Sequence, residues 1–160
     1  MSPSPEPARF TALARGAGRD RERSRAAVAV LRANATVSRA LDRALAEAGL
    51  TLPQFNVLME LAVTPDGALA LYELNDRLVT TPPNMSWLSG RMADAGLVTK
   101  QRSAADARVA VLALTEAGWA ALERALPLVS DAERALLAAY EPAELAVMAE
   151  LLSRLVGAPT

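Results

Sequence analysis

The sequence predicts a mainly α-helical protein with one small β-hairpin. Of its 160 residues, 52% are hydrophobic but only 4% are aromatic. A core built from small aliphatic side chains favours closely packed helices over a β-sandwich. Apolar residues recur at helical spacing over most of the chain. The block 98–114 instead alternates with a period of two around a charged tip, which indicates two short strands.

The N-terminal half is predicted to contain a tail and two helices. Residues 1–23 carry three prolines and scattered charge, which is typical of a flexible tail. A long helix without internal Pro or Gly is expected over 24–48 and ends at Gly49. Thr51 starts the next helix as the first residue of a capping box, and the turn sequence at 65–67 ends that helix.

The central block is predicted to fold as helix, turn, helix and hairpin. A very short strand at 69–71 precedes a helix over 72–78 and a second helix over 82–95. The strands of the hairpin are expected at 98–102 and 108–114. This is the layout of a winged helix-turn-helix, which places the second helix in the DNA major groove and the hairpin, or wing, beside it.

The C-terminal part is predicted to form two more helices. Thr115 caps a long helix that is interrupted near Pro127, and the last helix runs over 142–156. Apolar residues on the last helix follow the spacing of a seam that packs on another helix. They are Leu145, Met148, Leu152 and Leu155. This seam either packs within the chain or forms a dimer interface, and the long apolar first helix favours the dimer.

The expected fold is therefore a winged helix-turn-helix lobe plus a helical dimerisation layer. It divides the chain into a tail (1–23), a dimerisation helix (24–50), the winged lobe (51–118) and C-terminal dimerisation helices (119–160).

Composition excludes several classes of function. The chain has no cysteine and no histidine, which excludes disulfides, a cysteine redox switch, Ser-His catalysis and nearly every zinc site. We therefore expect no enzyme activity, no metal and no cofactor. No apolar run approaches the ~20 residues that span a bilayer, and no signal peptide precedes the first helix, so a cytoplasmic protein without a membrane partner is expected.

Charge points to the central block. The net charge of the chain is −1. Positive charge gathers in the tail and in residues 79–114, where Arg91 stands beside the wing cations Lys100, Arg102 and Arg108. This segregation favours double-stranded DNA as the partner.

The 82–95 helix has distinct inner and outer faces. Its inner face is predicted to consist of Met85, Leu88, Met92 and Ala95. Its outer face is predicted to consist of Pro83, Ser86, Trp87, Gly90 and Asp94. Glycine in an exposed helix is either tolerated there or marks close approach to another surface.

Side chains rather than backbone amides are expected to contact DNA. Thr81 caps the helix, and the prolines at 82 and 83 remove two amide donors from its first turn. Base contacts then fall to side chains near the start of the helix, and phosphate contacts to Lys100 and Arg102 on the first wing strand. The predicted DNA-contacting residues are Thr81, Pro83, Asn84, Ser86, Trp87, Lys100, Arg102 and Arg108.

The chain resembles the MarR family of transcription regulators over roughly residues 26–156. The matching segments are LPQFNVLMEL, LYELNDRLVTTPPNMSWLSGRMADAGLV, DAR in the wing and LTEAG directly after it. Their order and spacing together are fairly specific, and the predicted order of helices and wing agrees with that of the family.

The resemblance implies roles for individual residues. Asp106 and Arg108 match the D-x-R element of the wing, in which the Asp orients an Arg that enters the minor groove. The residue between them is Ala107, where relatives often carry a basic residue. Trp87 stands where many relatives carry an Arg. Trp87 cannot make the bidentate guanine contact of an Arg. It either contacts thymine methyls or the sugar-phosphate, or is a partly buried support residue.

The resemblance also implies a homodimeric regulator, most often a repressor, that binds a pseudo-palindromic operator. A small aromatic or lipophilic effector would bind between the dimerisation helices and the DNA-binding lobe. The pocket residues implied are Arg32, Asn34, Phe55, Met59 and Trp119, although taken singly each fits plain core or surface better.

Two other functions compete with this interpretation. The first is a winged-helix protein-interaction module that does not read DNA, favoured by Arg91 being the only cation of the 82–95 helix. The second is an enzyme that uses Glu or Asp pairs, for which no acidic pair stands at a mechanistic spacing.

Overall fold

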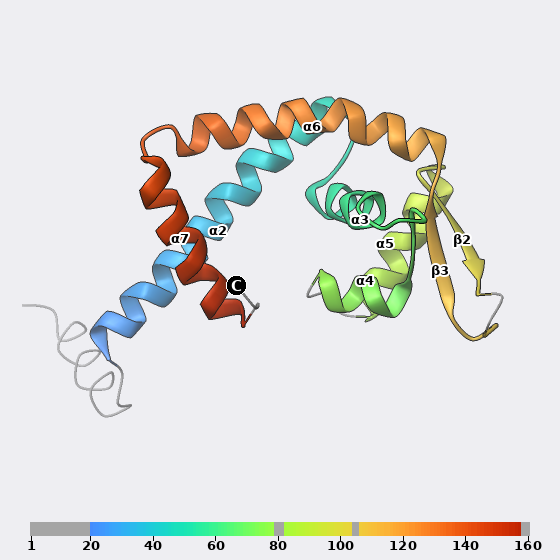
Figure 1. Ribbon diagram of the computed structural model, residues 1–160, viewed down its shortest axis with the longest axis horizontal. Coiled ribbons are helices and arrows are strands. Elements are labelled where there is room, and N and C mark those ends of the chain that lie inside the picture. The colour runs from blue at the N-terminus through green and yellow to red at the C-terminus, as the bar shows by residue number, and fades with distance from the viewer. Residues whose placement is uncertain (1–19, 79–81, 104–105, 158–160) are drawn as a thin grey trace, which may run out of the picture. The chain divides into compact units, whose positions relative to one another are not determined.

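The computed structural model describes residues 20–78, 82–103 and 106–157. The chain divides into two compact units, residues 1–39 and 40–160. The elements, shown in Figure 1, are α2 (Arg21–Glu47), α3 (Leu52–Ala62), β1 (Ala68–Ala70), α4 (Leu71–Arg77), α5 (Pro82–Asp94), β2 (Val98–Arg102), β3 (Ala110–Leu114), α6 (Glu116–Leu137) and α7 (Pro142–Val156). The prediction of a mainly helical protein with a small β-wing is confirmed.

In the first unit the described residues form the N-terminal part of α2. The helix begins at Arg21, three residues before the predicted start at Ser24. Asp20 explains the difference, because its carboxylate accepts hydrogen bonds from the backbone N–H of Glu22 at 2.8 Å and of Arg23 at 3.1 Å. A carboxylate at this position satisfies amide donors that have no partner within the helix. The predicted tail otherwise lies outside the described residues.

The second unit begins with the end of α2 and the turn into α3. Gly49 adopts a left-handed φ of 74° and ends α2 as predicted. The start of α3 is held from two sides. The backbone N–H of Thr51 donates to Oε1 of Gln54 at 2.9 Å, and the N–H of Leu52 donates to Oδ1 of Asp42 at 2.9 Å. The predicted capping pair Thr51 and Gln54, together with Asp42, which was not predicted, therefore fixes where the helix starts.

The three strands form one antiparallel sheet in the order β1-β3-β2. Leu112 of β3 stands opposite both Leu69 of β1 and Lys100 of β2. The second wing strand starts at Ala110 rather than at Arg108. The preceding residues form a turn instead, in which the N–H of Val109 donates to the carbonyl of Asp106 at 2.9 Å.

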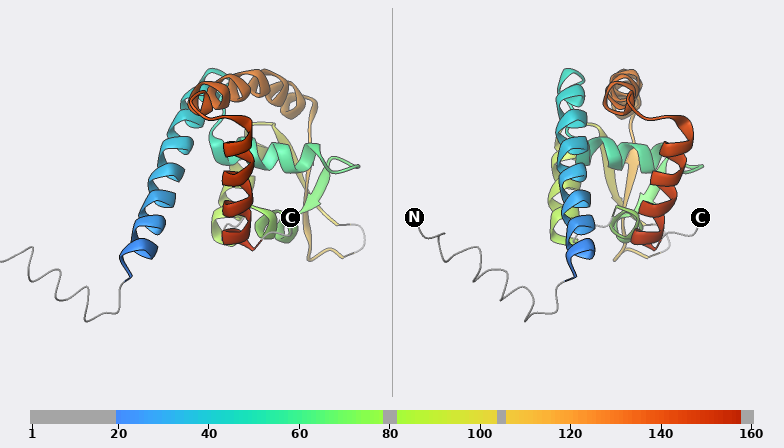
Figure 2. Two further views of the ribbon diagram at one scale, coloured as in Figure 1. Left: turned by 60° about the vertical axis from the view of Figure 1, so that its left-hand side comes forward. Right: turned by 90° about the vertical axis from the view of Figure 1, so that its left-hand side faces the viewer.

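The core of the second unit is mainly aliphatic and lies where α3, α4, α5, α6 and the sheet meet. Figures 1 and 2 show α4 and α5 packed together, α5 against β2, and α3 against α6. The fully buried large side chains are Leu45, Val57, Leu58, Leu61, Leu74, Met85, Met92 and Leu112. The core thus contains the small and medium aliphatic side chains that the composition predicts.

The helix α6 runs without interruption through Pro127, so the predicted break there is wrong. A proline removes one backbone hydrogen bond from a helix. Pro127 is exposed, whereas Ala125 and Val129 on either side of it are buried in the core. Packing of the inner face of α6 therefore maintains the helix across the missing hydrogen bond.

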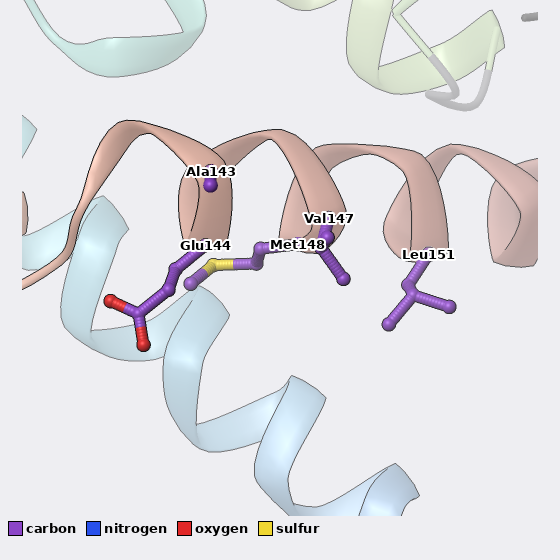
Figure 3. Close-up of a pocket in the computed structure, with 5 residues that line it drawn as sticks. All are labelled: Ala143, Glu144, Val147, Met148 and Leu151. Atoms are coloured by element: carbon purple, nitrogen blue, oxygen red, sulfur yellow. The ribbon is translucent and has the colours of Figure 1, made fainter.

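The last helix, α7, has the predicted bounds and buries none of its residues in the structure. Leu145 and Met148 of the predicted seam are partly exposed, and Leu152 and Leu155 are exposed. Figure 3 shows Glu144, Met148 and Leu151 projecting from one side of the helix, where they line an open depression. The apolar surface of α7 is thus not used as core within the described chain.

Candidate nucleic-acid interface

The helix α5 presents the predicted faces to the core and to solvent. Met85 and Met92 are buried, and Leu88 is partly buried against the core. The residues of the predicted outer face, Pro83, Ser86, Trp87, Gly90 and Asp94, are all exposed except Gly90, which is partly buried. Asn84, a predicted DNA contact, is exposed as well. Ala95 is an exception to the predicted inner face, because it lies past the last residue of α5 and is exposed. Thr81, the predicted cap, lies outside the described residues.

Trp87 and Arg91 form a stacked pair on the outer face of α5. The guanidinium carbon of Arg91 lies 5.3 Å from the centroid of the Trp87 ring, one helical turn further along. This is a cation–π contact between residues at i and i+4, which are neighbours on a helix surface. Trp87 is 66% exposed. The alternative that Trp87 is a partly buried support residue does not fit this exposure.

A buried serine connects α5 to the first wing strand. Ser89 is fully buried, donates from Oγ to the carbonyl of Ser86 at 3.0 Å, and accepts from Nζ of Lys100 at 3.2 Å. The ammonium of Lys100 is therefore placed at the junction of α5 and β2. Sequence reasoning missed Ser89, although it lies on the same helical stripe as Met85 and Met92, where a polar residue is a signal.

The wing carries two arginines whose groups interact near its tip. Nη1 of Arg102 donates to the backbone carbonyl of Arg108 at 3.3 Å. Asp106 accepts a hydrogen bond from the backbone N–H of Arg108 at 2.9 Å, and its Oδ1 lies 4.0 Å from Nε of the same arginine. The side chain of Arg108 remains 94% exposed. Asp106 thus holds the backbone of Arg108 while the guanidinium projects into solvent.

The start of α6 is joined to the chain just after α5. The hydroxyl of Thr115 accepts from the N–H of Gly118 at 3.0 Å, which confirms the predicted cap, and donates to the carbonyl of Gly96 at 2.7 Å. The N–H of Thr115 donates to the carbonyl of Leu97 at 3.3 Å. A Cβ on Gly118 would overlap that same Leu97 oxygen. We call Gly96, Leu97, Thr115 and Gly118 the α6 joint.

The five residues predicted for an effector pocket are spread over both units. Arg32 and Asn34 are exposed on the part of α2 in the first unit. On α3, Phe55 is buried in the core and Met59 packs against it. Trp119 is exposed on α6. Phe55 therefore has a structural role in the second unit, and an effector site made of these residues stays a prediction.

Neither a metal-binding cluster nor a membrane-spanning helix is found among the described residues. In this part of the chain, no group of three or more Asp or Glu side chains is arranged to hold a metal ion. None of its helices is both long and apolar enough to cross a bilayer.

Comparisons with known proteins assign the chain to a family. The family model described as MarR family matches residues 48–109, from the end of α2 to the wing. HTH-type transcriptional repressor Rv2887 of Mycobacterium tuberculosis is 33% identical over 107 residues, which cover 67% of this chain and 76% of the relative. The chain belongs to the MarR family. Members of this family are transcription regulators and not enzymes, which confirms the expectation that the protein is not an enzyme.

Solved structures of MarR-family regulators agree with this assignment. The chain is similar to Sco3205 from Streptomyces coelicolor in complex with DNA, with a TM-score of 0.78 and 26% identity. That match covers 87% of this chain and 91% of the other. It is also similar to the PcaV regulator of the same organism in complex with its natural ligand, with a TM-score of 0.63 and 27% identity over 68% of this chain and 76% of the other. The winged helix-turn-helix fold is therefore established for this chain.

Proposed function

We propose that this MarR-family regulator is a homodimeric repressor that binds a pseudo-palindromic operator through α5 and the wing. Each protomer would place α5 in a major groove and Arg108 in the adjacent minor groove. Two-fold symmetry then sets the centres of the half-sites about one helical turn, ~34 Å, apart. Such a regulator would act on chromosomal DNA, and would be associated with the nucleoid when bound, which agrees with the expected cytoplasmic location.

The observation that carries the proposal is the outer face of α5 beside an exposed basic wing. Asn84 and Ser86 offer hydrogen-bonding groups on the exposed start of the helix. Lys100, at the junction of helix and wing, and Arg108 at the wing add positive charge on the same lobe. Polar side chains on a helix read base edges, and flanking cations bind phosphate or a narrow minor groove.

The apolar surface of α7 supports the dimer. Its exposed large apolar residues are Val147, Leu151, Leu152, Leu155 and Val156. In the first unit, Val28, Leu31 and Val37 of α2 are also exposed. An exposed apolar surface marks a protein interface where it is contiguous, and in a homodimer the same surface is used by both copies. The dimerisation layer predicted from 24–50 and 119–160 would consist of these helices.

Release by a small aromatic or lipophilic effector is the third part of the proposal. The similar PcaV regulator was solved with its natural ligand. An effector that binds better to the dimer conformation unsuited to the operator would lower DNA affinity by population shift.

The test is fluorescence anisotropy against an operator across a salt series. The DNA is taken from upstream of the gene of the protein, or from in-vitro selection if that region does not bind. We expect selective binding whose log affinity falls linearly with log salt concentration. Arg108→Ala should weaken binding and lower the slope by about 0.9 for each phosphate that the variant no longer neutralises.

Arg134→Ala is the matched control, since Arg134 is an exposed arginine of α6 that pairs with Asp131 at 2.6 Å, outside α5 and the wing. Equal decreases in affinity for the two variants would reject a specific role for the wing. Failure to select any DNA sequence would reject the operator-binding function itself.

The second candidate function is a protein-interaction module. It is favoured by the exposed Trp87 and by Arg91, the only cation of α5, which stacks on that ring. Such a module would bind scrambled and selected DNA equally, and its binding to a protein partner would be abolished by Trp87→Ala.

A further inference from the structure

We propose that Trp87 reads the C5-methyl group of a thymine in the operator, and that Arg91 is the positioning residue that fixes the indole ring for this contact. The inference rests on the proposed function, in which α5 enters the major groove. It goes beyond that function because it assigns a base preference to one side chain of this chain.

The exposure of Trp87 is the first step of the argument. The side chain is 66% exposed on the outer face of α5, while the inner face of the same helix contains Met85 and Met92 in the core. The core therefore does not account for the indole. A large apolar ring on the face that meets DNA is removed from water only when a partner covers it.

The second step concerns the orientation of the ring. The guanidinium of Arg91 lies over the indole at 5.3 Å from its centroid, and both residues are exposed. This contact restricts the rotation of both side chains and occupies one face of the ring. With Arg91 in this position Trp87 is still 66% exposed, so part of the ring surface is left for DNA.

The third step concerns the space above the helix at Gly90, which lies on the same face of α5 as Trp87. A Cβ built at Gly90 meets no atom within 4 Å. The helix surface is therefore open at this position, and no side chain there keeps a base pair away from α5.

The chemistry of the major groove identifies the group that is read. An indole has a single N–H donor and no acceptor, so it cannot make the paired hydrogen bonds by which side chains select guanine or adenine. The apolar group that a base pair displays in the major groove is the thymine methyl. An apolar ring held at the groove therefore discriminates in favour of thymine.

The experiment replaces thymines of the selected operator by deoxyuridine, one symmetric pair of positions at a time. Deoxyuridine keeps the base pairing and lacks only the methyl group. We expect one position in each half-site at which the replacement weakens binding, by about fourfold for each methyl removed from contact. Trp87→Ala should bind the thymine operator more weakly and should bind the thymine and deoxyuridine operators equally.

Two further variants test the role of Arg91. Arg91→Met keeps a long side chain but removes the cation, and should lower the ratio of thymine to deoxyuridine affinity. Arg91→Lys keeps the cation and should recover part of that ratio. A role of Arg91 limited to phosphate binding would lower both affinities equally and leave the ratio unchanged. The Trp119→Phe variant leaves Trp87 as the only tryptophan, and its fluorescence should change when the thymine operator binds.

The outcomes separate this inference from the proposed function. If no DNA is selected, both are overturned. If DNA is selected but no deoxyuridine position matters, while Trp87→Ala still weakens binding, the ring packs against sugar and phosphate and the inference is overturned alone. If sensitivity to deoxyuridine persists in Trp87→Ala, another group reads the methyl. Circular dichroism checks that each variant is folded.

Discussion

Two helical glycines of this chain have opposite surroundings. Gly118 at the start of α6 lies against the carbonyl oxygen of Leu97, which a Cβ would overlap. Gly90 of α5 faces open space. The same residue type is therefore required by packing at one position, whereas stability does not require it at the other.

Gly118→Ala should destabilise the protein. The methyl group can be accommodated only if α6 or the backbone at Leu97 shifts, and overpacking of this kind costs about 1–3 kcal/mol. Urea denaturation followed by circular dichroism measures the change in the free energy of unfolding. An unchanged urea midpoint would contradict this expectation and would show that the start of α6 shifts to accommodate the methyl group without a loss of stability.

Gly90→Ala is the matched substitution and should have the reverse effect on stability. Alanine inside a helix is favoured over glycine by up to about 1 kcal/mol. A Cβ at the partly buried Gly90 would meet open space, so the free energy of unfolding should rise. If Gly90 also lets DNA approach α5, operator affinity should fall in the same stabilised variant. A gain in stability with unchanged operator affinity would mean that the glycine is merely tolerated.

The structural role of a single residue could be predicted from the sequence where that role depends on residues nearby in the chain. The roles of Thr51, Gly49 and Thr115 depend on neighbours within a few residues, and the structure confirms them. Ser89 and Gly118 depend on Lys100 and Leu97, which are distant in sequence. Their contacts come from packing between elements, which the sequence pattern alone does not specify.

At the scale of elements, the α6 joint connects the last helices to the winged lobe. Thr115 makes polar contacts there to Gly118 within α6 and to Gly96 and Leu97 before the wing. One residue thus caps a helix and also ties that helix to the end of α5.

Thr115→Ala should lower the free energy of unfolding by about 1 kcal/mol, the usual cost of removing an N-cap side chain. Thr115→Ser keeps the hydroxyl and should retain most of the stability. Thermal denaturation of the three proteins measures the effect. If serine were as damaging as alanine, the methyl group rather than the hydroxyl would be the important part of the side chain.

Element boundaries illustrate where sequence reasoning was sufficient. The bounds of α7 and β2 agree with the prediction, because Pro142 and Gly157 border the helix and Gly96 comes shortly before the strand. The break predicted at Pro127 is wrong, since burial of the neighbouring Ala125 and Val129 outweighs the local effect of proline. Tertiary packing decided the outcome there.

At the scale of the whole molecule, the proposed dimer depends on the apolar face of α7. Leu155→Asp places a charge on this face at a residue that is 67% exposed in the single chain, so the protomer should stay folded. We expect a shift from dimer to monomer in sedimentation velocity. Operator affinity should then fall by at least tenfold, because one protomer contacts only one half-site.

Glu150→Ala on the same helix is the control and should leave the dimer intact. A dimer that survives Leu155→Asp would place the interface elsewhere on the chain. Sequence spacing predicted the seam on α7 but left open whether it packs within the chain. The structure leaves these residues out of the core, which supports the dimer interpretation.

The α6 joint has a mechanical consequence. Gly118 lies directly against the carbonyl of Leu97, and the hydroxyl of Thr115 donates a hydrogen bond to the carbonyl of Gly96. The first turn of α6 is therefore held tightly against the residues that follow α5. The buried residues Ala121, Ala125 and Val129 also hold α6 to the core further along its length. We therefore expect a displacement of the C-terminal end of α6 to rotate the winged lobe as one piece, and so to change the angle at which α5 faces its target.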